Sequence, residues 1–211
     1  MNAQTEKRLV PGPAGPIEIA VDLPAGGATP LGTALICHPN PTQGGTMDNK
    51  VVQTLARAFL QLGWRAVRFN FRGIGQSEGA WDEGRGEVDD ALAVLAAVRA
   101  PGEALILAGF SFGGYVASRA AQRVIEPAQR LVLVGPATSR FDTAPVPADT
   151  VVIHGEVDDV VPLASVLDWA RPQSLPVTVV PGVGHFFHGQ LPLLKSLVVR
   201  AFDPMLDRPR A

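Results

Sequence analysis

The feature that most constrains the fold is an apolar run that passes through Gly-Phe-Ser-Phe-Gly at 109–113. Residues 104–108 have the length and apolar character of a buried strand, and the small residues of 112–124 predict a helix. A chain that turns this sharply from strand to helix leaves no room for a Cβ at either glycine. It also holds Ser111 in a strained conformation, with its hydroxyl raised above the end of the strand. The pattern therefore predicts that Ser111 is a nucleophile.

Strand-like and helix-like segments alternate along the rest of the chain. Strands are expected at 6–10, 17–23, 32–38, 64–69, 104–108, 130–134, 150–153 and 177–180, and helices at 49–62, 88–98, 112–124, 163–170 and 191–202. This alternation is typical of βαβ units with right-handed crossovers. We therefore expect an α/β fold: a three-layer sandwich around a mostly parallel sheet of about eight strands, beginning with an antiparallel hairpin.

The composition excludes several classes of protein. The length of 211 residues suits one domain, expected to cover 1–211, and a net charge of −2 offers no basic surface for nucleic acid or membranes. No apolar run approaches 18 residues, and the stretch 1–8 lacks the apolar core of a signal peptide. The single cysteine, Cys37, excludes an internal disulfide and fits a reducing cytoplasm. Its apolar neighbours predict a buried, unreactive side chain.

A serine nucleophile needs a histidine base, which an acid must orient. His185 follows the last expected strand in a glycine-bearing loop, from which it can reach over the serine, so we expect it to be the base. His188 is the alternative, at the expected start of the closing helix, where a capping or surface role is more natural. The acid should precede this histidine in the chain.

The acid is expected in the loop after the strand at 150–153. Asp158 is the choice there, because Glu156 and Asp159 are better placed to face solvent or cap the next helix. His154 closes the strand and is expected to be packed and hydrogen-bonded. No second acidic cluster supplies metal ligands, so we expect no metal.

Acyl transfer also requires two N–H groups that bind the developing oxyanion. The N–H of Phe112, at the start of the expected helix, supplies one. The second should come from the loop after the strand at 32–38. Within Pro-Asn-Pro at 39–41 only Asn40 has a backbone N–H, so it is favoured by elimination. The alternative is that residues 38–45 are merely a turn-rich connection.

Five motifs together resemble the small, lidless α/β-hydrolases of the dienelactone-hydrolase-like type. They are Gly-Phe-Ser-Phe-Gly at 109–113, His-Gly-Glu-Val-Asp at 154–158, Gly-His-Phe-Phe at 184–187, the segment 38–47, and Phe-Asn-Phe-Arg-Gly-Ile-Gly-Gln-Ser at 69–77. The resemblance implies a Ser-Asp-His triad, no cap domain and bacterial hydrolase activity. Dienelactone hydrolases proper use cysteine as the nucleophile, whereas position 111 here is serine. The loop at 73–75 lacks the third glycine of a dinucleotide site, and we expect no cofactor.

The expected function is hydrolysis of a small ester, thioester or lactone, as in a carboxylesterase, with a small acyl compound as the partner. A small peptidase or amidase is the alternative among enzymes, because the same triad cleaves amides. A hydrolase-fold binding protein without catalysis is the alternative outside enzymes. The segment 136–149 is short and carries Pro136, Pro145 and Pro147, so it predicts no helical lid and an open cleft.

Overall fold

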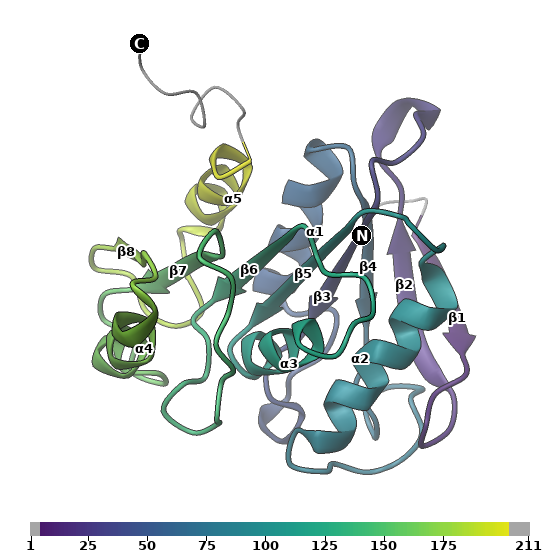
Figure 1. Ribbon diagram of the computed structural model, residues 1–211, viewed down its shortest axis with the longest axis horizontal. Coiled ribbons are helices and arrows are strands. Elements are labelled where there is room, and N and C mark those ends of the chain that lie inside the picture. The colour runs from purple at the N-terminus through teal and green to yellow at the C-terminus, as the bar shows by residue number, and fades with distance from the viewer. Residues whose placement is uncertain (1–4, 203–211) are drawn as a thin grey trace.

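Within residues 5–202, which the structure describes, eight strands form one sheet with helices on both faces (Figure 1). The structure is a computed structural model, and residues 1–4 of the amino-terminal stretch considered above lie outside the described part. The strands are β1 (Glu6–Val10), β2 (Ile17–Asp22), β3 (Thr33–Cys37), β4 (Arg65–Phe69), β5 (Leu105–Phe110), β6 (Arg130–Val134), β7 (Val151–Gly155) and β8 (Thr178–Val180). The α-helices are α1 (Lys50–Gln61), α2 (Arg85–Val98), α3 (Phe112–Ala121), α4 (Leu163–Ala170) and α5 (Leu191–Arg200).

The strands lie in the order β1-β2-β4-β3-β5-β6-β7-β8. β1 and β2 form an antiparallel hairpin, β2 is antiparallel to β4, and the pairs from β4 to β8 are parallel. The expected architecture is confirmed. Parallel strands end at the same edge of a sheet, so the loops after β3, β5, β7 and β8 gather there.

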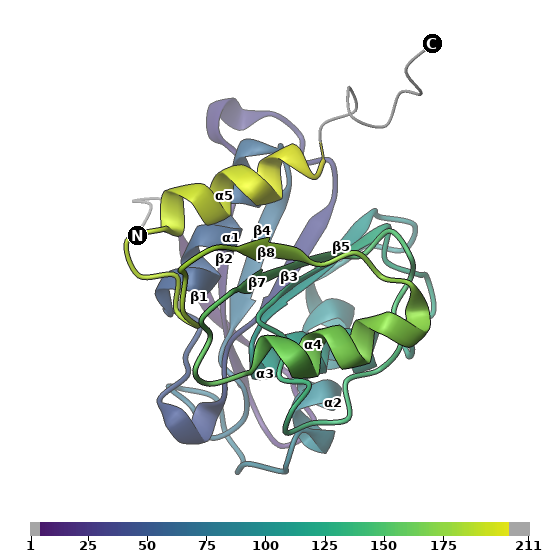
Figure 2. The ribbon, with the colours of Figure 1, turned by 90° about the vertical axis from the view of Figure 1, so that its left-hand side faces the viewer.

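The helices form two layers, which Figure 2 shows with the sheet seen from its β8 edge. α1 and α5 cover one face, and α2, α3 and α4 cover the other. On the first face Phe59 and Leu194 pack with Ile36 of β3, and on the second Val94 and Val116 pack with Leu35 of the same strand. Strands covered on both faces explain the continuous apolar runs that predicted them.

The connection between β6 and β7 is hydrogen-bonded to two helices. Its Ala144 N–H donates to the hydroxyl of Ser118 on α3 at 3.0 Å, and the Trp169 indole of α4 donates to the carbonyl of Thr143 at 3.1 Å. The described residues between these strands contain no helix. The expectation that this segment forms no lid is therefore confirmed.

One helix begins earlier than expected, and one histidine lies outside the helix that it was expected to start. α2 begins at Arg85 rather than Val88, because the Glu87 carboxylate accepts the N–H of Gly84 at 2.7 Å and so caps an earlier turn. α5 begins at Leu191, as expected, but His188 lies in the turn before it, so the expectation that His188 starts the closing helix is wrong. None of the described helices has both the length and the apolar character needed to cross a membrane.

Candidate active site

Ser111 occupies the sharp turn between β5 and α3. Its backbone has φ 56° and ψ −119°, a conformation that a residue with a side chain rarely adopts. The two flanking glycines make the turn possible: a Cβ at Gly109 would collide with the Gly113 carbonyl, and one at Gly113 with the Cys37 carbonyl. The strand, turn and helix expected around this serine are confirmed.

Asp158 lies in the loop after β7 and is held by backbone donors. Its Oδ1 accepts the N–H groups of Val160 and Val161 at 3.0 and 2.8 Å, and its Oδ2 contacts Nδ1 of His185 at 2.6 Å. Burial alone would raise the pKa of Asp158, but the hydrogen bonds from His185 and Val161 outweigh it and lower the pKa below its usual value. The carboxylate is therefore ionised at neutral pH, and Nδ1 of the imidazole carries the proton that it donates.

His185 lies against the strand that leads into the elbow. Its ring packs on Phe110, the residue before Ser111, with 4.8 Å between the ring centroids. Gly135 also lies close to the ring: it has φ +50°, and a Cβ there would come within 3.3 Å of the imidazole. Because Nδ1 carries a proton, Nε2 is free to accept one. The ring is thus joined to Asp158, whereas no hydrogen bond links it to the Ser111 hydroxyl within residues 5–202.

The alternatives named from the sequence occupy exposed positions. Glu156 and Asp159 face solvent, and the Glu156 carboxylate accepts the N–H of Gly182 at 2.8 Å. Asp159 does not cap α4, whose N-cap residue is Pro162. His188 is exposed and lines, with His185 and Asp159, a surface hollow of about 510 Å³. Of the candidate acids and bases in the loops after β7 and β8, only Asp158 and His185 are buried and in contact with each other.

His154 differs from its expected role. It is fully buried, and its Nε2 lies 3.0 Å from the Val161 carbonyl and 3.5 Å from Oδ2 of Asp158. Its Nδ1 has no hydrogen-bond partner among the described residues, so the expectation of a fully hydrogen-bonded side chain is wrong. Burial lowers the pKa of His154, which keeps the ring neutral. The contact with the acid gave no signal in the sequence beyond the spacing of four residues.

The two candidate oxyanion donors lie in the loops after β5 and β3. Phe112 is the first residue of α3, so its N–H has no acceptor within the helix. The Asn40 N–H donates to no backbone carbonyl in the described part of the chain, while its carbonyl accepts the N–H groups of Gln43 and Gly45 at 3.1 and 3.0 Å. Two hydrogen bonds within the turn therefore hold the Asn40 carbonyl in place.

His38 fixes the start of that loop. Its Nδ1 lies 2.6 Å from the Pro39 carbonyl, and its Nε2 accepts the N–H of Phe71 at 3.1 Å, so the ring is a neutral imidazole with the proton on Nδ1. The ring is fully buried and packs on Phe71 at 4.4 Å between centroids. This burial lowers the pKa of His38 from 6.5 to about 4.

Because the pKa of His38 is low in the folded protein, the free energy of unfolding depends on pH. Between pH 6.5 and pH 4 the unfolded chain binds a proton at His38 and the folded chain does not, so acid favours unfolding. At about 1.4 kcal/mol per pH unit, we expect His38 to account for a loss of about 3 kcal/mol in the free energy of unfolding across this range. Urea denaturation of the wild type and His38→Gln at pH 7 and pH 4 measures it. Equal losses in both proteins would contradict the assignment.

Other candidates have structural roles. Cys37 is buried, which raises the pKa of its thiol. At the glycine-rich loop 73–75, a Cβ on Gly75 would collide with the side chains of Asn70 and Glu18. Within residues 5–202 no group of three His, Cys, Asp or Glu side chains is placed to hold a metal ion.

The sheet order, the helices on both faces and the strained serine elbow define a serine hydrolase of the α/β-hydrolase fold. A family model described as serine aminopeptidase, S33, matches residues 32–166. The chain therefore belongs to this family of serine α/β-hydrolases.

Similar proteins come from several bacteria. A solved serine α/β-hydrolase without lid from Xanthomonas campestris is 40% identical, with a TM-score of 0.87, and the alignment covers 100% of this chain and 98% of that one. An α/β serine hydrolase homologue from Coxiella burnetii is 39% identical with a TM-score of 0.82, over 94% and 97% of the two chains. An uncharacterised protein of Rickettsia prowazekii is 31% identical over 73% of this chain and 71% of its own length.

Proposed function

We propose that Ser111, His185 and Asp158 form a catalytic triad that hydrolyses a small ester, thioester or lactone through an acyl-enzyme. The hydrogen bond of 2.6 Å between Asp158 and His185, with the imidazole packed beside the elbow, is the observation that carries the proposal. Membership of a serine α/β-hydrolase family supports it.

In the proposed mechanism Nε2 of His185 takes the proton from the Ser111 hydroxyl as Oγ attacks the carbonyl carbon. Asp158 stabilises the imidazolium that results, and the Asn40 and Phe112 N–H groups bind the oxyanion. The imidazolium then protonates the leaving group, which departs and leaves the acyl group on Ser111. Water attacks this ester in the same way, with His185 again acting as base and then as acid.

An amide substrate is the second candidate, because the matching family is described as a serine aminopeptidase. The exposed Asp159 carboxylate lines the same surface hollow as His185 and offers a charge that suits a free amino group. A protein that binds without turnover is the remaining alternative. It predicts no covalent adduct with an activated acyl donor, whereas both enzymatic candidates predict one on Ser111.

Substrate size gives the first test of the ester assignment. The β6–β7 connection contains no helix and supplies no lid, so long acyl chains gain little of the roughly 0.8 kcal/mol that each buried methylene contributes. Across p-nitrophenyl esters from acetate to palmitate, we expect kcat/KM to level off or fall beyond roughly four to six carbons. Matched thioesters and aminoacyl p-nitroanilides separate the ester from the amide candidate. A maximum at long chains would contradict the open cleft.

A further inference from the structure

The loop that carries the Asn40 N–H, residues 38–46, is attached to the sheet at both ends. Its first end continues from β3 and is held by His38. Within the loop the Gly45 N–H donates to the Asn40 carbonyl at 3.0 Å, and a Cβ on Gly45 would collide with the Pro39 carbonyl. Any shift of the second end therefore passes through Gly45 to the peptide groups next to Asn40.

The second end is held at Met47 by two side chains of the β4 region. The Met47 N–H donates to Oδ1 of Asn70 at 2.9 Å, and the Met47 carbonyl accepts from Nη1 of Arg68 at 3.1 Å. The same Nη1 donates to Oδ1 of Asp48 at 3.0 Å. Both backbone polar groups of Met47 are thus bonded to side chains.

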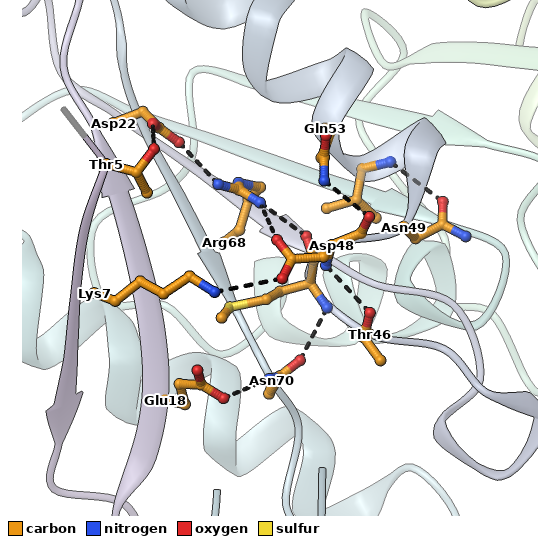
Figure 3. A network of polar contacts seen from close by, with 12 residues as sticks. Thr5, Lys7, Glu18, Asp22, Thr46, Asp48, Asn49, Gln53, Arg68 and Asn70 are labelled. Carbon is orange, nitrogen blue, oxygen red and sulfur yellow. Dashed lines mark hydrogen bonds and ion pairs between the residues drawn. The ribbon is translucent and has the colours of Figure 1, made fainter. Parts of the chain in front are cut away.

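The two side chains that hold Met47 are themselves fixed from β2. Nη2 of Arg68 donates to Oδ2 of Asp22 at 3.0 Å, and both side chains are almost fully buried. Nδ2 of Asn70 donates to Oε2 of Glu18 at 2.7 Å, and that oxygen also accepts the Gln76 N–H at 3.0 Å. Figure 3 shows the Asp22–Arg68 and Glu18–Asn70 contacts, and the contact between Arg68 and Asp48 in the segment that leads into α1. We name Glu18, Asp22, Arg68 and Asn70 the β2–β4 polar cluster.

Stability alone does not account for this cluster. A buried ion pair is often no more stabilising than apolar residues of the same volume, because both charges lose their hydration. Here Nε of Arg68 is buried without a partner among the described residues, which adds a further cost. The cluster instead fixes the orientation of the Met47 backbone, because a guanidinium and an amide bind it in a defined geometry.

We propose that Arg68 and Asn70 are positioning residues for the oxyanion hole, acting through Met47 on the loop that presents the Asn40 N–H. The proposal rests on the proposed function, in which that N–H binds the oxyanion. Losing their bonds to Met47 should let the loop relax and weaken one oxyanion donor, while the triad and the binding of the ground-state ester stay the same.

The sharpest test compares two arginines on the same strand. Arg65, at the other end of β4, donates to the Val98 carbonyl at 2.6 Å and pairs with Glu103 at 3.0 Å. Like Arg68, it thus binds one backbone carbonyl and one carboxylate. In Arg68→Lys the charge remains, but one ammonium replaces the fork that reaches Met47 and Asp22 together. We expect kcat for p-nitrophenyl acetate to fall about tenfold in Arg68→Lys with KM within threefold, and to stay within twofold in the control Arg65→Lys.

Asn70→Ala removes the acceptor of the Met47 N–H. We expect its kcat to fall about 10- to 100-fold, since complete loss of one oxyanion donor costs about 10²–10³. Binding of a trifluoromethyl ketone, whose adduct with Ser111 places an oxyanion in the hole, should weaken by the same factor as kcat. If Asn70→Ala does not fold, Arg68→Lys decides by the same two measurements.

Equal kcat in Arg68→Lys and Arg65→Lys would overturn the proposal, and so would ketone affinities that do not follow kcat. Either result leaves the proposed function intact as long as the activity still depends on Ser111. Activity that survives Ser111→Ala would instead contradict the proposed function itself.

Discussion

Replacing Ser111 with alanine should lower kcat on the order of 10⁶-fold, because the members of a triad act as one unit. The side chain is small and lies at the end of a strand, so the melting temperature should change little. Ester hydrolysis measures the rate, and a fluorophosphonate probe measures covalent labelling, which should disappear in the variant. Labelling of the wild type would exclude a protein that only binds.

Ser118 on the same helix provides the control. Its hydroxyl donates to the Tyr115 carbonyl at 2.7 Å and accepts the Ala144 N–H at 3.0 Å, which are structural contacts. Ser118→Ala should therefore cost about 1–3 kcal/mol of stability and keep kcat within a few-fold at a temperature where it is folded. Residual activity above a few per cent in Ser111→Ala would disprove its assignment as nucleophile.

The second large effect separates neighbouring histidines and neighbouring acids. His185→Ala should approach the defect of Ser111→Ala, whereas His188→Ala should keep most of the rate, because only the ring at 185 bonds the buried carboxylate. Asp158→Asn should lower kcat by about 10⁴, since an amide no longer holds the imidazole in the tautomer that accepts the serine proton. Asp159→Asn should change kcat little.

Steady-state kinetics of the four variants on one short ester measures these effects. The two residues in each pair share a loop and differ in burial, so each exposed member controls for a change in loop charge. If the variant of the exposed residue lost more activity than the variant of its buried neighbour, the exposed residue would be the base or the acid instead.

The fold was predictable because its signals are local. The apolar runs of β3, β5 and β6 are buried on both faces, and the strained turn at Ser111 requires the two glycines that the motif contains. Helix starts were less predictable where an unusual residue caps them. Glu87 accepts the N–H groups of Asp82 and Gly84, and α2 therefore begins almost one turn closer to the amino terminus than expected.

The polar contacts between distant strands were not predictable from the sequence. Glu18 and Arg68 each stand among apolar residues of a strand and look like outward-facing positions. They meet Asn70 and Asp22 because β2 pairs with β4, and alternation along one strand does not show which strand lies beside it. His154 is similar, since its contact with Asp158 depends on how the loop folds back.

The β6–β7 connection has a consequence for how enzymes of this shape diversify. The connection starts beside the elbow, where the Ala137 N–H donates to the Ser111 carbonyl at 3.2 Å, and Ser139 and Arg140 are exposed just after this point. They precede residues 143–146, which hydrogen-bond to α3, α4 and the turn that follows α4. Additional residues at Ser139 and Arg140 would extend the chain without breaking those bonds, and each doubling of a loop's length costs only about 0.6 kcal/mol in closure entropy. A lid inserted there would change which substrates reach the active site without disturbing the buried Asp158–His185 pair. An insertion at this junction would therefore convert an open active site into an enclosed one.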